Sequence, residues 1–353
     1  MSRVLRRLAE ARPAQLDQPA PKPLDLDTIT VVPMESARRP SPARRRVALA
    51  ATAFTAVASM IAVGNLVPGD GRQSPIAGRQ SLLVAAQLAS AQSEPMGAYW
   101  VSRSEQGTRY AVTGGYNVFG RTDQHSWMPL TAEGGNAYCV QWLGAAPVTD
   151  ADREAWQRAG SPATWAASGP GGEPTPGRTL TAQPGEKGCK RLPDRGPGVN
   201  VGGTTLTLDQ LRALPTDPDQ LAELLLRNET DARGTWQPDD LAEHQTEMLF
   251  IAATDLLLRL PSSGAVRSAA YLMLADLPGI TYLGEVTDPL GRRGSAVEHT
   301  FRSADGSSQR HRLVIDVVTG QTMASEIRDG QSGALISCTA VTESTYSDQA
   351  PAT

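Results

Sequence analysis

The sequence predicts an α+β domain that is built on an antiparallel sheet and preceded by a single transmembrane helix. Three observations support this prediction. Residues 47–67 form an uncharged apolar run, residues 214–279 contain three helical patterns, and period-two alternation of apolar residues appears before and after those patterns. We therefore expect a curved antiparallel sheet of about eight strands with helices packed on one face.

The apolar run at residues 47–67 has the length of a membrane span. Its 21 residues carry no charge, and a helix of that length spans about 31 Å, which matches a hydrocarbon core of about 30 Å. Arg44, Arg45 and Arg46 flank it on the N-terminal side. The positive-inside rule then predicts a single-pass cell-membrane protein with residues 1–46 in the cytoplasm and the C-terminal domain outside.

A cleaved export signal is the main alternative for this run, because Arg45 and Arg46 precede it as in a loose twin-arginine signal. The long N-terminal region and the continuation of the apolar run past Ala56-Val57-Ala58 argue against cleavage. A buried core helix is a further alternative, but the run lacks the polar stripe of such helices. We favour a retained anchor.

Charge is distributed unevenly along the 353 residues, whose net charge is −4. Residues 1–46 carry about +5, and the remainder about −9. The Pro-rich basic tail is expected to be largely disordered and close to anionic lipid. The acidic remainder argues against nucleic acid as a partner. The scarcity of lysine indicates a GC-rich genome and hence an actinobacterium.

The elements of the outer domain follow in order along residues 81–346. A stalk at 68–80 precedes the domain, and the segment 160–203 is expected to be an irregular insertion because 18 of its 44 residues are Gly or Pro. We expect residues 347–353 to be disordered. Helices are predicted at 81–92, 214–232, 236–261 and 263–279, and strands at 97–106, 116–130, 135–144, 280–288, 294–303, 309–319, 321–329 and 333–347.

The three cysteines do not form a metal-binding or redox motif, because no C-x-x-C pair occurs. In an oxidising exterior two of them can pair. We expect Cys139, in a strand, to bond to Cys189, in the Gly/Pro-rich insertion, and so to fix that segment to the sheet. Cys338 is then expected to remain a buried thiol.

Other motifs give no catalytic, cofactor or metal site. The stretch "DPLGRRG" at 288–294 resembles a phosphate loop, but a strand follows it, so a hairpin loop is the better interpretation. Arg292 and Arg293 in that loop remain a minority candidate for an anionic headgroup. His299 and His311 fall on neighbouring predicted strands, but two histidines alone make a poor metal site.

Aromatic residues are concentrated in the first three predicted strands. Trp100, Tyr138 and Trp142 are the candidates for lining a cleft between the sheet and the helices. Ordinary core packing is the alternative for these side chains. A twisted sheet that its helices do not fill would leave an apolar cleft wide enough for an acyl chain or a lipid-modified partner.

The order of these parts resembles a family of uncharacterised single-pass membrane proteins of actinobacteria. The resemblance is carried by "RRR" before the anchor, "LPTDPDQLAELL", "LPGITYLGEVTDPLGRRGSAVE" and "LVIDVVTGQTMASE". It implies membrane attachment but no established activity. The layering is also similar to the lipoprotein-carrier fold, which lipid-binding and sigma-factor-regulating sensor domains share. That likeness concerns fold alone.

Two functions of different class remain open. The first is a non-enzymatic, membrane-anchored envelope domain that binds or senses a lipid, a lipoprotein or a protein partner. The alternative is a cell-surface hydrolase with a dispersed active site. A polar constellation within hydrogen-bond reach in a pocket would distinguish the hydrolase from the binding domain.

Overall fold

The computed structural model describes residues 75–92, 97–131, 135–168, 174–192, 198–233, 241–302 and 307–351. The predicted membrane span at 47–67 and its arginines lie outside these ranges. Every helix in the described ranges is too short or too polar to cross a membrane. All described residues belong to one unit of the chain.

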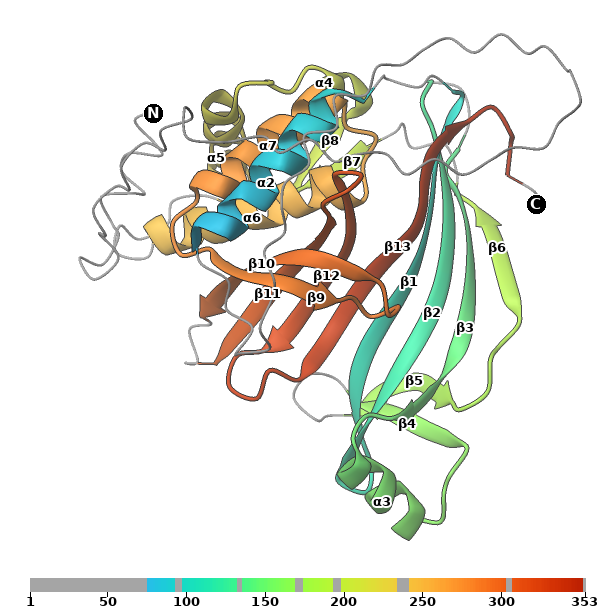
Figure 1. Cartoon of the computed structure of the whole chain (residues 1–353). Coiled ribbons are helices and arrows are strands. Elements are labelled where there is room, and N and C mark those ends of the chain that lie inside the picture. Colours follow the sequence, from blue (N-terminus) through green and yellow to red (C-terminus); the bar gives the residue numbers. More distant parts are fainter. Residues whose placement is uncertain are drawn as a thin grey trace, which may run out of the picture. The chain divides into compact units, whose positions relative to one another are not determined.

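A nine-stranded sheet, antiparallel at every pairing, forms the centre of this unit (Figure 1). The α+β prediction is therefore confirmed, with nine strands in place of about eight. Figure 1 shows the long strands bending along their length. In sheet order the strands are β6 (Lys187–Arg191), β3 (Ala137–Pro147), β2 (Tyr116–Pro129), β1 (Tyr99–Val112), β13 (Leu335–Ser347), β12 (Gln321–Asp329), β11 (Ser308–Asp316), β10 (Arg293–Arg302) and β9 (Thr281–Thr287).

The first and last strands of the unit meet at the middle of the sheet. β1 pairs with β13 from Tyr99 opposite Ser347 to Thr108 opposite Ser337. This pairing joins the early block, β1 to β3, to the late block, β9 to β13. Within each block a strand pairs with the strand next to it in sequence, whereas the joint between blocks depends on contacts far apart in sequence.

Helices gather at one end of the sheet and cover one face of β9, β10 and β12 (Figure 1). Their apolar sides form the main core with Val297, Phe301, Leu313 and Ile315 of the strands. Burial of each such side chain contributes about 1.5–3 kcal/mol. The helices are α2 (Pro75–Ser90), α4 (Leu208–Arg212), α5 (Pro218–Arg233), α6 (Leu241–Leu258) and α7 (Gly264–Asp276), and α3 (Asp150–Arg158) lies at the other end of the sheet.

α2 and α7 pack closely in antiparallel fashion. Arg79 of α2 pairs with Asp276 of α7 at one end, with Nη2 and Oδ1 2.6 Å apart. At the other end a Cβ on Gly264 would lie 2.4 Å from the carbonyl oxygen of Ala89, so this position requires glycine. The predicted stalk at 68–80 needs correction, because α2 begins at Pro75. The Gly78 backbone packs against the Tyr282 ring there.

The Gly/Pro-rich segment 160–203 is more regular than expected. It contains β4 (Thr164–Ser168), β5 (Pro174–Thr181), β6 and β7 (Gly198–Val201). β4 and β5 form a hairpin, β7 pairs with β8 (Thr204–Thr207), and β6 extends the main sheet. Trp165 and Leu180 of the hairpin enter a second core with Val112, Tyr116 and Val118. Strands this short lack the alternation that sequence patterns detect.

Cys139 and Cys189 are joined by a disulfide that connects β3 to the edge strand β6. All five residues of β6 are exposed, so few side-chain contacts hold this strand. Cys338 is a half-buried free thiol on β13. After β13 the chain remains in contact with the sheet, since Asp348 Oδ1 accepts a hydrogen bond from the Ala98 amide and Pro351 is buried. The prediction of disorder from residue 347 is therefore wrong for these residues.

Candidate functional site

β12 and β13 separate from each other at one end of the sheet. Their pairing runs from Arg328–Leu335 to Ala324–Ala340 and stops there. Both strands continue, β12 as Gln321–Met323 and β13 as Val341–Ser347, and we call these two diverging segments the fork. Within the described residues no backbone hydrogen bond joins the two sides of the fork.

Each side of the fork is paired on its outer edge. Gln321 and Thr322 face Asp316 and Ile315 of β11, and Val341–Ser347 face Ser104–Tyr99 of β1. In an antiparallel ladder the backbone groups of a strand point alternately to its two neighbours. The inner edges of the fork, at Gln321–Met323 and Val341–Thr345, therefore present N–H and C=O groups that no described strand pairs with.

Arg292, from the β9–β10 loop, closes the apex of the fork. Its Nη1 donates to the Val341 carbonyl at 2.7 Å, and its Nη2 donates to the Met323 carbonyl at 3.1 Å. Asp288 holds the guanidinium through Nε–Oδ2 at 2.7 Å and accepts from the Leu290 and Arg292 amides. The Asp288 side chain is fully buried. The loop at 288–294 is thus a hairpin loop, as predicted, and the Arg292 guanidinium donates hydrogen bonds to Asp288, Met323 and Val341.

Two neighbouring clefts, which share lining residues, lie between the fork and the ends of α2, α6 and α7. The first has a volume of about 230 Å³ and the second about 310 Å³. Both are lined by Gln92, Trp100, Arg267, Gln321 and Ser344. Nine of the seventeen residues that line the first cleft are polar or charged: Gln92, Arg267, Arg292, Asp316, Gln321, Thr322, Thr342, Glu343 and Ser344.

Trp100 and Tyr271 are fixed aromatic walls of the clefts. The Trp100 indole donates Nε1–H to the Arg259 carbonyl at 3.0 Å and meets the Tyr346 ring edge-on, with centroids 5.0 Å apart. Tyr271 Oη donates to the Gly320 carbonyl at 3.0 Å and lies 2.8 Å from Thr322 Oγ1. Burial raises the pKa of Tyr271 to about 12. Both residues hold the walls rigid.

Only one of the three predicted aromatic residues lines these clefts. In the sheet, Trp100 lies opposite Met128 of β2 and Trp142 lies opposite Thr122 of β2, and these two partners are six residues apart on that strand. At about 3.3 Å per residue the two indoles lie about 20 Å apart along the strand. Trp142 packs on the second core and donates Nε1–H to the Thr181 carbonyl at 2.9 Å. Tyr138 lies on β3 beside the edge strand, opposite Lys190.

The predicted histidine pair is confirmed, since His299 and His311 are direct cross-strand partners. The Phe301 ring touches both imidazoles, with centroids 4.7 Å and 4.1 Å away. Burial, with a smaller contribution from His299, lowers the pKa of His311 to about 4. Across the described ranges no cluster of three His, Cys, Asp or Glu side chains is arranged to hold a metal ion.

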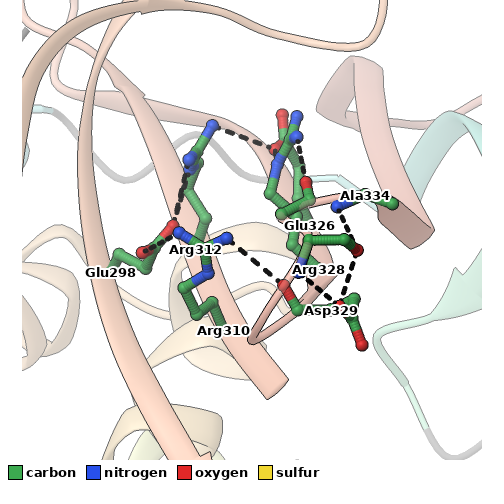
Figure 2. Close-up of polar contacts among 9 residues, drawn as sticks. Glu298, Arg310, Arg312, Glu326, Arg328, Asp329 and Ala334 are labelled. Atoms are coloured by element: carbon green, nitrogen blue, oxygen red, sulfur yellow. Dashed lines mark hydrogen bonds and ion pairs between the residues drawn. The ribbon is translucent and has the colours of Figure 1, made fainter. Parts of the chain in front are cut away.

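The opposite face of the sheet carries a ladder of arginines and glutamates (Figure 2). Arg312 lies between two buried carboxylates, with Nη2 3.0 Å from Glu298 Oε2 and Nη1 3.4 Å from Glu326 Oε2. Arg328 Nε donates to Glu326 at 2.6 Å. Because an arginine pairs with each carboxylate, this ladder does not resemble a pair of carboxylates set for acid–base chemistry.

The sequence-based prediction did not find three residues of the fork and its clefts in these positions. Arg292 was interpreted as part of a turn, with an anionic headgroup as the minority alternative, and Arg267 and Ser262, which line the second cleft, were not selected. Ser263-Gly264, which marks the start of a helix directly after Pro261, is the sequence feature that could have drawn attention to Arg267 and Ser262. The hydrolase alternative requires a nucleophile bonded to a base. The Thr322 hydroxyl in the cleft is bonded to Tyr271 instead.

Comparison with known proteins gives little beyond this geometry. The chain matches no established family model, and no curated protein sequence is detectably similar to it. One similar solved structure is the Pseudomonas aeruginosa MucA/MucB complex, at 12% identity and TM-score 0.24, with 76% of this chain and 56% of that chain covered.

Another similar structure is a DUF1329 family protein from Desulfovibrio piger ATCC 29098. It is 10% identical, has a TM-score of 0.18, and the match covers 78% of this chain and 94% of that chain. The present chain spans a little over half of the MucA/MucB chain that it matches. At TM-scores this low, neither likeness indicates a function for this chain.

Proposed function

We propose that this protein is a non-enzymatic binding domain and that its ligand is an extended polypeptide segment held in the fork. The observation that carries this proposal is that no described strand pairs with the inner edges of the fork at Gln321–Met323 and Val341–Thr345, where Arg292 holds the Met323 and Val341 carbonyls alone. An extended segment satisfies such edges with its own backbone N–H and C=O groups. Rigid walls at Trp100 and Tyr271 give its side chains surfaces to pack against.

A polypeptide fits the clefts better than a lipid acyl chain does. The space between the helices and the sheet is filled by the main core, whose largest side chains are fully buried. The open space lies at the fork, where the lining is largely polar. An acyl chain there would leave hydroxyl, amide and backbone groups without hydrogen-bond partners, at a cost of about 1–3 kcal/mol each. A peptide backbone supplies those partners.

We place this binding domain outside the cytoplasmic membrane, tethered by the apolar run at 47–67. The support is the sequence: the run itself, with Arg44, Arg45 and Arg46 before it.

Affinity selection from a pool of random octapeptides tests the proposal. The full chain, purified in detergent and immobilised, is compared with Ser344→Trp, which fills both clefts with an indole at an exposed position. Gln331→Trp is the matched control, since it adds the same ring on the exposed β12–β13 turn. Melting temperatures establish that the variants are folded.

We expect the wild type and Gln331→Trp to enrich the same subset of peptides and Ser344→Trp to lose that enrichment. Retention of the same peptides by folded Ser344→Trp would overturn the assignment of the fork. An absence of enriched peptides with the wild type would overturn the peptide-binding function itself.

A further inference from the structure

The N-terminus of α7 opens into the second cleft. This helix has 13 residues, and its N-cap Ser263 accepts a hydrogen bond from the Val266 amide at 3.2 Å. The Ser263 carbonyl accepts from the Arg267 amide at 2.9 Å. The amides of Gly264 and Ala265 remain, since the first N–H groups of a helix have no acceptor within it. The positive end of the helix dipole lies at the same place.

A second and independent observation concerns Ser262. This residue is only 3% exposed and lines the second cleft. Its Oγ is buried and has no hydrogen-bond partner among the described residues. A buried hydroxyl without a partner carries a desolvation penalty that a bound acceptor would remove. The hydroxyl therefore indicates a ligand with an acceptor atom at this position.

Charge in the second cleft favours an anion. Arg267 is the sole charged side chain among the eleven described residues that line it. One of its nitrogens, Nη2, donates to Gln92 Oε1, and the described residues offer no hydrogen-bond acceptor to Nε or Nη1. Opposing groups are the carbonyls of Ala89 and Gln92, which approach Gly264 from α2. The carboxylates of Asp316 and Glu343 line the first cleft and not the second.

We propose that Arg267, the Ser262 hydroxyl and the first amides of α7 form a carboxylate-binding site that anchors the polypeptide segment in the fork. This inference rests on the proposed function and makes it more specific. A carboxylate accepts several hydrogen bonds at once and pairs with a guanidinium. The carboxylate belongs either to the C-terminus of the segment or to an acidic side chain. Either source offers the same chemistry to the site.

The peptide selection described above tests the inference when it is run with two pools. One pool of octapeptides ends in a free acid and the other in an amide. We expect enriched peptides to carry a carboxylate: in the first pool alone if the C-terminus binds, and as Asp or Glu in both pools if a side chain binds. Enrichment without a preference for a carboxylate would overturn the inference and leave the proposed function intact.

Variants assign the carboxylate to the site. Arg267→Gln should weaken binding of an enriched peptide at least about tenfold, because a charge-assisted hydrogen bond is lost. Arg259→Gln is the matched control, an arginine at the end of α6 whose side chain does not line either cleft. Ser262→Ala should weaken binding without lowering the melting temperature, because its hydroxyl has no partner to lose. Unchanged affinity in folded Arg267→Gln and Ser262→Ala would contradict the site.

A direct measurement separates this inference from the proposed function. In the full chain labelled with 15N-arginine, the Arg267 Nε–H signal is assigned by its loss in Arg267→Gln. Titration with acetate should shift that signal and leave the Arg259 signal in place. A shift without any enriched peptide would retain the carboxylate site and reject the peptide ligand. An Arg267 signal that acetate does not move would reject the site.

Discussion

Replacing Arg292 with alanine tests whether this side chain closes the apex of the fork. The change removes the two hydrogen bonds to the carbonyls of Met323 and Val341 and the cation that pairs with Asp288. Loss of one partner of a buried ion pair costs about 3–5 kcal/mol. The Arg292 side chain is 35% exposed, and Asp288 keeps two backbone donors. We therefore expect a smaller loss of about 2–3 kcal/mol in the free energy of unfolding.

The adjacent Arg293 provides a matched control. Its side chain is 82% exposed and pairs with Glu285, which is itself half exposed. Arg293→Ala should change the free energy of unfolding by less than about 0.5 kcal/mol. Arg292→Lys should recover part of the loss, because an ammonium keeps the charge but cannot reach both carbonyls and the carboxylate.

Chemical denaturation and thermal melting of the full chain measure these differences. At about 2–4 °C per kcal/mol, Arg292→Ala should melt roughly 5–10 °C below the wild type. Equal stability of Arg292→Ala and Arg293→Ala would show that the guanidinium does not hold the two strands together. The account of the fork as a clamped opening would then be wrong.

Three further predictions follow from titration and cysteine chemistry. The pKa of His311 in the folded state is about 4, below the unfolded value near 6.5, so protons bind preferentially to the unfolded chain. The free energy of unfolding should therefore fall by about 3 kcal/mol as the pH is lowered from 6.5 to 4. His311→Gln should not show this dependence of stability on pH. Cys189→Ala, which opens a loop with a sequence separation of 50, should lower the free energy of unfolding by about 4 kcal/mol in the chain-entropy model, and an unchanged denaturation midpoint would contradict a stabilising bridge. Burial raises the pKa of Cys338 to about 11, so this thiol should react with a maleimide at pH 8 only after denaturation, and rapid labelling of the native protein would contradict its placement on β13.

The late strands could be predicted from sequence because their signals are local. β9 to β13 have alternating apolar residues and are joined by Gly- and Asp-rich turns, so their positions agree with the predicted ranges within a few residues. α7 was predicted for the same reason, with Ser263 at its start and Pro278-Gly279 after its end. β4 to β7 were missed because Gly and Pro conceal strands of four to eight residues.

The fork could not be predicted because it arises from register. The β11–β12 ladder shifts between Val314 and Ile315, and the β1–β13 ladder shifts between Arg103 and Ser104. Both irregularities lie beside the last β12–β13 pair at Ala324 and Ala340. Such bulges bend a strand away from its neighbour. The placement of Trp100 in the cleft and Trp142 in the second core depends on the same long-range register.

Hydrogen exchange in the presence of a bound peptide tests the central claim most directly. The full chain is exchanged with and without an enriched octapeptide, and deuterium uptake is read by mass spectrometry. Strand addition in the fork predicts new protection at Gln321–Met323 and Val341–Ser347, the two segments that form the fork, and no change in β6 or α3. Protection that appears elsewhere, with the fork exchanging as in the free protein, would contradict the assignment of this opening as the binding site.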